Sequence, residues 1–182
     1  DGMPYLDFCG RITAYAGKPY IEVEHQFIHA EAATELSLES LTLSFRPEYS
    51  GVSPHLALGQ GYYRTAIQES DDAPLEMAID TETILYQANE HFIDSFYGDF
   101  WVDWRDESGG VMLSIYQAHQ NFPKKLRVAK DGIVCSLYPD DAPPAPLLQG
   151  MAKTHRIQLH FHAPDASLAG GSVRSLQFQL PD

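Results

Sequence analysis

The chain is poor in cysteine and in basic residues, and it contains no long hydrophobic run. Its two cysteines, Cys9 and Cys135, provide no disulfide framework, and we expect both to be free, buried thiols. Twelve Lys and Arg against 25 Asp and Glu give a formal net charge of −13, which opposes binding to nucleic acid and to anionic membranes. No apolar run approaches the roughly 18 residues of a membrane span. We therefore expect neither a nucleic-acid nor a membrane partner.

Several common motifs are also absent. The sequence has no phosphate-binding glycine loop, no serine nucleophile elbow and no zinc-binding cysteine pair. Its first residues contain neither the basic nor the apolar region of a signal peptide. A length of 182 residues with 44% hydrophobic content fits one domain with a well-buried core. Because the first residue is not methionine, we expect residues 1–182 to be a single domain cut from a longer, multidomain protein.

The clearest pattern is a strand within residues 150–164. Apolar and polar residues alternate there, in the order Arg156, Ile157, Gln158, Leu159, His160, Phe161 and His162. A period of two predicts a strand with one buried face and one hydrated face. His155 and Lys153 share the parity of the buried face, which simple packing does not require. We therefore expect function to lie near this strand.

The rest of the chain reads as short strands and turns. Further strands are predicted at 10–16, 20–29, 36–45, 62–68, 111–119, 124–129, 132–138 and 173–180, and 78–93 also favours strands. The first three are expected to form one meander, with a bulge near Glu39, whereas 46–61 and 163–171 are expected to be irregular. The prediction is an all-β fold, an antiparallel, supersandwich-like β-sandwich of about ten strands.

Histidines form the first candidate site. His160 and His162 are two residues apart on one strand face, so their imidazoles could share a metal ion. No third ligand follows at a recognisable spacing, because Asp165 lies beyond a proline. Solvent-facing or hydrogen-bonded histidines are the alternative, and we expect no metal and no cofactor.

Aromatic residues form the second candidate. Tyr97, Phe100, Trp101 and Trp104 are interspersed with Asp99 and Asp103. Flat rings beside carboxylates can stack on sugars and accept hydrogen bonds from their hydroxyl groups. The alternative is that these rings are core residues that seal the sandwich.

Basic residues form the third candidate, because six of the twelve lie between positions 124 and 156. Lys130 is one of these six, and the candidate group comprises Lys124, Lys125, Arg127, Lys153, His155 and Arg156. If these side chains converge, they can hold a carboxylate. If they do not, they are hydrated side chains that are close only in sequence.

Short motifs spread over most of the chain resemble the exo-rhamnogalacturonan lyase family, also called YetA-like. They are Gly10-Arg11-Ile12, Tyr15-Ala16-Gly17-Lys18, Glu22-Val23-Glu24-His25, Gly98-Asp99-Phe100-Trp101, Asn121-Phe122-Pro123-Lys124, Gly150 and Lys153-Thr154-His155. Members of that family combine a barrel-like domain, a central β-sandwich and a helical toroid. This chain resembles the central sandwich alone, so the resemblance implies flanking domains in the same protein and makes independent catalysis doubtful.

The resemblance implies β-elimination on a pectic polysaccharide. That reaction needs a base, a cation to neutralise the uronate carboxylate and an acid for the leaving oxygen. His155 is the candidate base, and Arg156 or Lys124 the candidate neutraliser. Since His155 and Arg156 are neighbours on a strand, they point to opposite faces, and only one of them is expected to face the cleft.

Three hypotheses follow. The first is a sandwich domain of a polysaccharide-lyase-like, carbohydrate-active protein that forms part of the cleft or a scaffold, with Trp101, Trp104, Tyr97, Asp99, Lys124 and Lys153 binding the polysaccharide or oligosaccharide. The second is a stand-alone carbohydrate-binding module that works through Trp101, Trp104 and Tyr97. The third is a histidine-based metal site in a cupin-like barrel.

Overall fold

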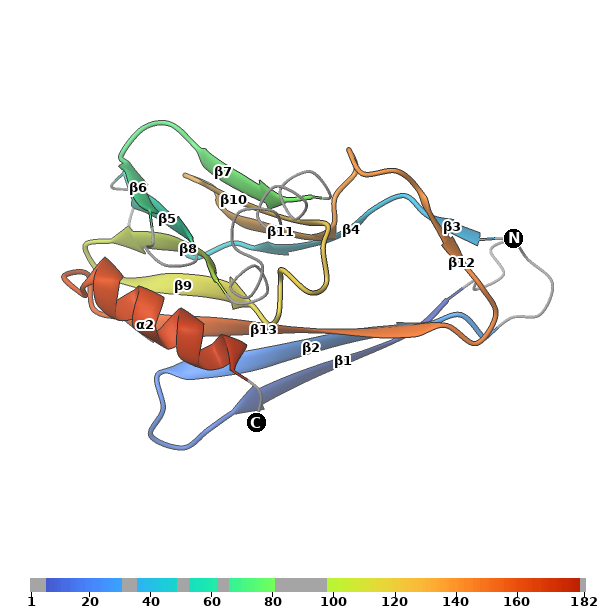
Figure 1. Ribbon diagram of the computed structural model, residues 1–182. Coiled ribbons are helices and arrows are strands. Elements are labelled where there is room, and N and C mark those ends of the chain that lie inside the picture. Colours follow the sequence, from blue (N-terminus) through green and yellow to red (C-terminus); the bar gives the residue numbers. More distant parts are fainter. Residues whose placement is uncertain (1–5, 31–35, 49–52, 62–65, 81–97, 181–182) are drawn as a thin grey trace.

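The computed structural model describes residues 6–30, 36–48, 53–61, 66–80 and 98–180 (Figure 1). The strands are β1 (Asp7–Ala14), β2 (Tyr20–Ile28), β3 (Leu36–Leu38), β4 (Leu41–Phe45), β5 (His55–Gly61), β6 (Ala66–Ser70), β7 (Leu75–Ile79), β8 (Asp99–Asp106), β9 (Gly109–Ile115), β10 (Lys124–Ala129), β11 (Gly132–Tyr138), β12 (Ala145–Leu147) and β13 (Ala152–His162). One helix, α2 (Leu168–Gln179), follows them. None of the described helical residues forms a segment long and apolar enough to cross a membrane.

Antiparallel sheets form a sandwich, which confirms the predicted all-β fold class. The larger sheet has the order β1-β2-β13-β9-β8-β5-β6, and the smaller has the order β4-β11-β10-β7 (Figure 1). The short strands β12 and β3 pair separately. The hairpins β1–β2 and β10–β11 are formed as predicted. The predicted meander is wrong in its third member, because β2 pairs with the distant β13 and β4 joins the other sheet.

The main core lies between the two larger sheets. Fully buried side chains from both meet there, among them Leu58, Phe100, Leu113, Leu126 and Ile157. Each comes from a strand whose alternate residues face away from the core. Burial of these apolar faces against each other is the dominant favourable contribution to folding.

Strand β13 is formed where the alternation predicts it, and it lies between β2 and β9. Ile157 and Leu159 are buried on its inner face, as expected, whereas Phe161 at the end of that face is half exposed. The opposite face is less hydrated than predicted, because α2 packs across the same side of the larger sheet (Figure 1). His160 on this outer face is therefore buried.

The helix α2 replaces the strand predicted at 173–180. Alternation of Leu176, Phe178 and Leu180 favours a strand, but the buried residues of α2 follow helical spacing through Gly171, Ser172, Ser175 and Phe178. Small residues let the helix lie close to the sheet. A Cβ atom on Gly171 would come 2.0 Å from the Met112 methyl carbon. Ser167 caps the helix by accepting a hydrogen bond from Gly170 N.

Three further predictions need correction. Residues 46–61 are not irregular throughout, because β5 occupies their second half. The strand predicted at 111–119 ends at Ile115, and Gln117 has a positive φ of 48° that suits a turn. The bulge expected near Glu39 is a break between β3 and β4. Most of the ambiguous stretch 78–93 and Tyr97 lie outside the described residues.

Candidate functional site

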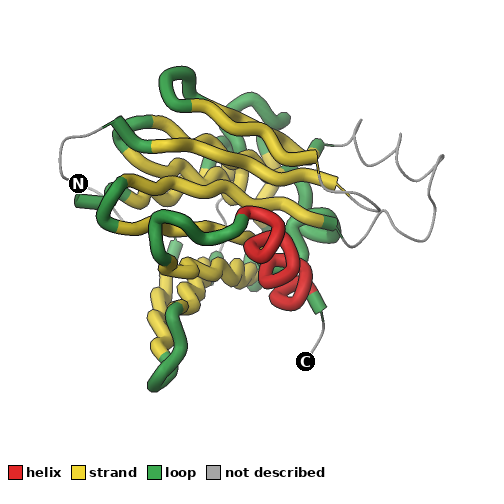
Figure 2. The backbone as a smooth tube through the Cα atoms, turned by 90° about the vertical axis from the view of Figure 1, so that its left-hand side faces the viewer, coloured by secondary structure: helices red, strands yellow, loops and turns green. Residues whose placement is uncertain are grey.

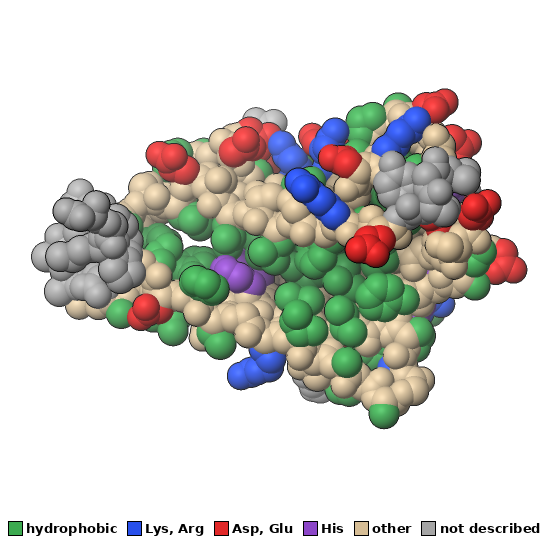
Figure 3. Space-filling view, turned by 180° about the vertical axis from the view of Figure 1, so that it is seen from behind, with side chains coloured by type: hydrophobic (Ala, Val, Ile, Leu, Met, Phe, Trp, Pro, Cys, Tyr) green, Lys and Arg blue, Asp and Glu red, His purple; other side chains and the backbone are tan. Residues whose placement is uncertain are grey.

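A cavity of about 370 Å³ opens between β13 and the β10–β11 hairpin, at the end of the sandwich where β3 and β12 pair. Its lining is Phe27, Leu38, Gln120, Asn121, Phe122, Lys124, Leu137, Tyr138, Ala145, Pro146, Leu147, Met151, Ala152, Lys153 and His155. Figure 3 shows the rear face of the molecule, where histidine lies in a hollow rimmed by hydrophobic side chains. We call this space the lysine cavity.

Three predicted site residues meet in the lysine cavity. Lys124 begins β10, and only 2% of it is exposed. Lys153 and His155 are two residues apart on β13, so both project from its inner face. Lys153 lies 29 positions after Lys124 in the sequence, and the packing of the two sheets against each other brings both side chains to the same cavity.

Asn121 holds both lysines. The Lys153 ammonium donates to the side-chain oxygen of Asn121, while the Lys124 ammonium donates to the backbone oxygen of Asn121 and, at 3.0 Å, to that of Pro123. Asn121 is itself fixed, because its amide nitrogen donates to the backbone oxygen of Gln117 at 2.9 Å. The turn that carries it therefore sets the positions of two cations.

The turn that carries Gln117 and Asn121 is also hydrogen-bonded to α2, on the far side of the larger sheet. The backbone nitrogen of Gln117 donates to Gln179 Oε1 at 2.6 Å, and Gln179 Nε2 donates to the backbone oxygen of Ile115 at 2.8 Å. Gln179 is buried at the last turn of the helix. A chain of hydrogen bonds thus runs from the helix through Gln117 and Asn121 to the lysine cavity.

Burial dominates the electrostatics of the lysine cavity. It lowers the pKa of Lys124 to about 7, with a further contribution from the nearby positive charge of Lys153. It also lowers the pKa of Lys153, and it lowers that of His155 to about 3, where Lys124 and Lys153 add to the effect. No Asp or Glu occurs among the described residues that line the cavity. Within the described lining, the two lysines therefore lie in the cavity without a carboxylate beside them.

Arg156 lies on the other face of β13, as the alternation predicts. Its guanidinium is 4.7 Å from the ring centre of Tyr116, and Nη2 is 3.3 Å from Glu22 Oε2. It lines a groove of about 540 Å³ between β2, β13 and α2, together with His160 and Arg174. Arg156 and His155 therefore cannot act on one substrate group, and their joint assignment to a catalytic site lacks geometric support.

The two histidines proposed as metal ligands have different environments. Their rings are stacked with centres 6.2 Å apart, and His162 Nε2 is 2.7 Å from Asp103 Oδ2. Burial lowers the pKa of His160 to about 4. Burial also opposes protonation of His162, but the hydrogen bonds to Asp103 and to the backbone oxygen of Ala163, together with the charge of Asp103, raise its pKa. Across the described part of the chain, no three His, Cys, Asp or Glu side chains are placed to hold a metal ion. A histidine-based metal site therefore has no support here.

The aromatic cluster is buried. Phe100 and Trp104 belong to the core between the sheets, and Trp101 on the opposite face of β8 is sealed beneath α2, where Nε1 donates to Ser172 Oγ at 3.1 Å. Asp99 is also fully buried. Trp101 and Trp104 have no exposed ring face on which a sugar could stack, so their packing matches the core alternative. Tyr97 lies outside the described residues.

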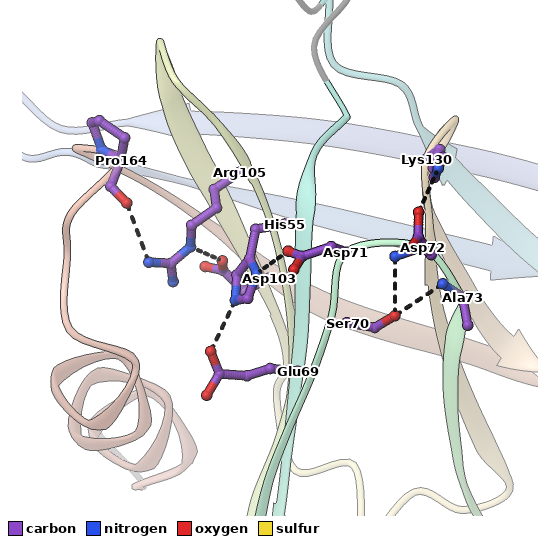
Figure 4. Close-up of polar contacts among 10 residues, drawn as sticks. All are labelled: His55, Glu69, Ser70, Asp71, Asp72, Ala73, Asp103, Arg105, Lys130 and Pro164. Atoms are coloured by element: carbon purple, nitrogen blue, oxygen red, sulfur yellow. Dashed lines mark hydrogen bonds and ion pairs between the residues drawn. The ribbon is translucent and has the colours of Figure 1, made fainter.

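Carboxylates compensate positive charge elsewhere in the molecule, as Figure 4 shows. Arg105 Nε is 2.7 Å from the buried Asp103, and His55 bridges Asp71 at 2.7 Å and Glu69 at 2.9 Å. Although burial opposes it, hydrogen bonding to these two acids raises the pKa of His55. In these contacts the basic side chain has a carboxylate partner within the protein, whereas no described acid lines the lysine cavity.

Sequence reasoning missed the residues that organise the cavity. The sequence motifs include Asn121 but indicate no role for it, and the strand predicted at 173–180 contains Gln179. Lys125 and Arg127 do not converge with Lys124, because they project from the opposite face of β10 toward Glu76 and Asp140. The thiols are free as predicted, but Cys9 is exposed and only Cys135 is buried.

Comparisons with known proteins add little. No protein-family profile and no curated protein matches the sequence. One similar solved structure is an Escherichia coli K12 protein assigned only provisionally as an aldose 1-epimerase, with 10% identity and a TM-score of 0.43. The match covers 90% of this chain and 62% of that one, so the chain spans less than two thirds of that protein. We draw no functional conclusion from this similarity.

Proposed function

We propose that this β-sandwich domain binds the carboxylate of an acidic sugar in the lysine cavity, as part of a polysaccharide-lyase-like protein that acts on pectic polysaccharide. The observation that carries the proposal is the pairing of Lys124 with Lys153 in a cavity whose described lining has no acid. A buried cation without a counter-ion is costly, and a bound carboxylate compensates it. The resemblance of the sequence to rhamnogalacturonan lyases supplies the sugar class.

The rest of the lining suits a sugar better than an isolated ion. Apolar and aromatic side chains, including Phe122 and Tyr138, surround the two ammonium groups. Cavities of this kind bury the carbon skeleton of a ligand while a few polar groups fix its orientation. The amide of Gln120 and the ring of His155 lie at the same wall. We propose that the domain forms a binding wall of a larger cleft.

If the parent protein carries out elimination at this cavity, Lys124 has a more suitable basicity than His155. A general base works best when its pKa is near the working pH, and that of Lys124 is lowered to about 7 while that of His155 falls to about 3. Lys153 then remains as the cation that neutralises the uronate. This assignment revises the roles that the sequence suggested.

The test is calorimetric titration of the chain with rhamnogalacturonan oligosaccharides, and with the same oligosaccharides after reduction of their carboxyl groups. Only the acidic form is expected to bind, and Lys124→Met or Lys153→Met should each weaken it about tenfold, the value of one charge-assisted hydrogen bond. Lys125→Met is the matched control, because Lys125 lies on the same strand but points away from the cavity. Equal binding of the reduced oligosaccharide would refute the proposal.

Two further readouts separate binding from catalysis. Above pH 7, a bound carboxylate should make Lys124 take up a proton, so the heat of binding should depend on the ionisation enthalpy of the buffer, and Lys124→Met should abolish that dependence. Absorbance of unsaturated uronates in the same samples would show that this domain alone carries out elimination. Binding without that absorbance would assign it to the wall of the cleft.

A further inference from the structure

Strand β1 is an unprotected edge of the seven-stranded sheet. Among the described strands it pairs with β2 alone, and all but one of its residues are exposed. Figures 1 and 2 show the β1–β2 hairpin at the lower side of the sheet, away from the four-stranded sheet. Natural edge strands are commonly blocked by Lys, Pro or a bulge, and β1 has none of these.

The hydrogen bonds identify which backbone groups of β1 are open. His29 N donates to Met151 O, and Phe161 N donates to Pro19 O. The odd-numbered residues of β2 therefore direct their backbone N–H and C=O groups toward β13. The even-numbered residues of β2 therefore direct their backbone groups toward β1, where Gln26 is opposite Cys9. It follows that odd-numbered β1 residues bond to β2, while Phe8, Gly10, Ile12 and Ala14 direct their N–H and C=O groups outward.

We propose that β1 pairs antiparallel with β1 of a second copy, about a two-fold axis that passes through Cys9. In this register Phe8 exchanges backbone hydrogen bonds with Gly10 of the second copy, and Ile12 does so with Leu6. Cys9 then faces Cys9 in a non-hydrogen-bonded pair, in which Cα atoms are about 4.5 Å apart. The seven-stranded sheets of the two copies then join into one continuous sheet.

Charge selects this register among the symmetric ones. It places Asp7 opposite Arg11 of the second copy, twice, and both are non-hydrogen-bonded positions where cross-strand side chains approach closely. An axis through Asp7 or Arg11 instead places like charges opposite each other. Arg11 already lies 2.7 Å from Glu24, and its exposed guanidinium has donors left for a second carboxylate.

Apolar contacts favour the same register. Phe8 and Ile12 are the most exposed large hydrophobic residues in the described part of the chain, at 78% and 71%. Both lie on the inner face of β1. A Cβ atom on Gly10 would meet nothing within 4 Å, so the ring of Phe8 from the second copy has room to lie over this glycine. Pairing covers Phe8 and brings Ile12 against Leu6.

A single strand pair buries less surface than a standard interface, so the dimer is expected to be weak and concentration-dependent. Sedimentation equilibrium of the full chain over a roughly hundredfold concentration range should show a monomer of 20.3 kDa in equilibrium with a dimer. A monomer at every concentration would overturn the proposal, as would a trimer or a larger assembly.

A charge exchange tests the register. Asp7→Lys and Arg11→Glu should each raise the dissociation constant roughly tenfold, and the double variant should restore it. Within one copy these positions are about 13 Å apart along the strand, too far for direct contact, so restoration has to arise between copies. Asp131→Lys, in the β10–β11 turn, is the control. A dimer indifferent to the single changes would overturn the proposed register.

The thiols provide an independent test. The thiol oxidant diamide should link two copies through a disulfide between their Cys9 side chains. As the sulfur–sulfur bond forms, the two thiols give up two protons and two electrons, which reduce the nitrogen–nitrogen double bond of diamide. Covalent dimer should form in the native chain, should be lost in Cys9→Ser, and should persist in Cys135→Ser, since Cys135 is buried. If a flanking segment or another protein covers β1 instead, no covalent dimer forms, and the proposal fails.

Discussion

The two faces of β13 carry similar side chains with opposite electrostatic outcomes. On the outer face, Arg156 is 3.3 Å from Glu22, and His162 is 2.7 Å from Asp103. On the inner face, Lys153 and His155 line a cavity whose described walls contain no acid. Hydrogen bonding to a carboxylate raises the pKa of His162, whereas burial lowers that of His155 to about 3.

The comparison separates structural charge from charge available to a ligand. The outer-face cations are neutralised within the protein, so a ligand gains little by approaching them. No described acid lines the cavity of the inner-face cations, so under the proposal a bound carboxylate compensates them. The predictions that follow change groups on one face or the other.

The largest effect is expected from Asp103→Asn on the outer face. This change removes the carboxylate that accepts from both Arg105 and His162, leaving a charge without its partner in a buried setting. Urea denaturation should show a loss of about 3–5 kcal/mol in the free energy of unfolding. Asp72→Asn is the control, since its pair with Lys130 is exposed, and it should cost less than about 0.5 kcal/mol. Comparable losses in the two variants would contradict the comparison.

The pH dependence of stability should differ in sign between the faces. The folded-state pKa of His155 lies below its ordinary value of 6.5, so its contribution is complete above that value and is lost as pH falls toward 3. His162 has a raised pKa, so its contribution is complete below pH 6.5 and is lost as pH rises through the folded value.

This difference can be measured by thermal or urea unfolding between pH 3 and pH 8. His155→Gln should remove a slope of up to about 1.4 kcal/mol per pH unit on the acid side of 6.5. His162→Gln should change the slope on the alkaline side instead. Identical changes in the two variants would show that the faces do not differ.

An intermediate effect is expected when an acid is placed in the lysine cavity. Asn121→Asp keeps the shape of the side chain and adds a carboxylate beside Lys153 and Lys124. It should raise the pKa of both lysines, which NMR titration can measure. It should also weaken the binding of acidic oligosaccharides about tenfold. Gln158→Glu adds the same charge to the outer face and should leave binding nearly unchanged. Undiminished binding in Asn121→Asp would count against the cavity as the carboxylate site.

The smallest effect is expected from Arg156→Ala. Loss of its contacts with Tyr116 and Glu22 should lower stability by about 1 kcal/mol. Affinity for acidic oligosaccharides should change less than about twofold, because the side chain points away from the lysine cavity. A large loss of affinity in calorimetry would restore Arg156 to the binding site that the sequence suggested.

Part of the candidate site was accessible from the sequence. Alternation alone put His155 and Lys153 on the inner face of one strand and Arg156 on the other. It could not place Lys124 beside them, because β10 and β13 belong to different sheets and the way these sheets pack is not a local property. Nor could it reveal Asn121 as the common partner of two lysines, since that contact forms through a turn fixed from α2.

Burial explains the remaining errors. The dense aromatic stretch suggested a sugar platform, but exposure depends on what covers a strand, and α2 covers Trp101. The same helix was missed because its buried face is built from glycine and serine instead of large apolar residues. Hydrophobic periodicity detects faces that bury large side chains, and it is blind to close approach by small ones.

Local sequence patterns are enough to specify the strands with strong alternation, the two hairpins and the all-β class, because side-chain period and turn chemistry are local properties. Which strands are neighbours, and which faces are covered, follows from the packing of segments that are distant in sequence. The same packing decides which charges have partners. Those outcomes depend on contacts between distant segments, and a cation's pKa follows from that environment.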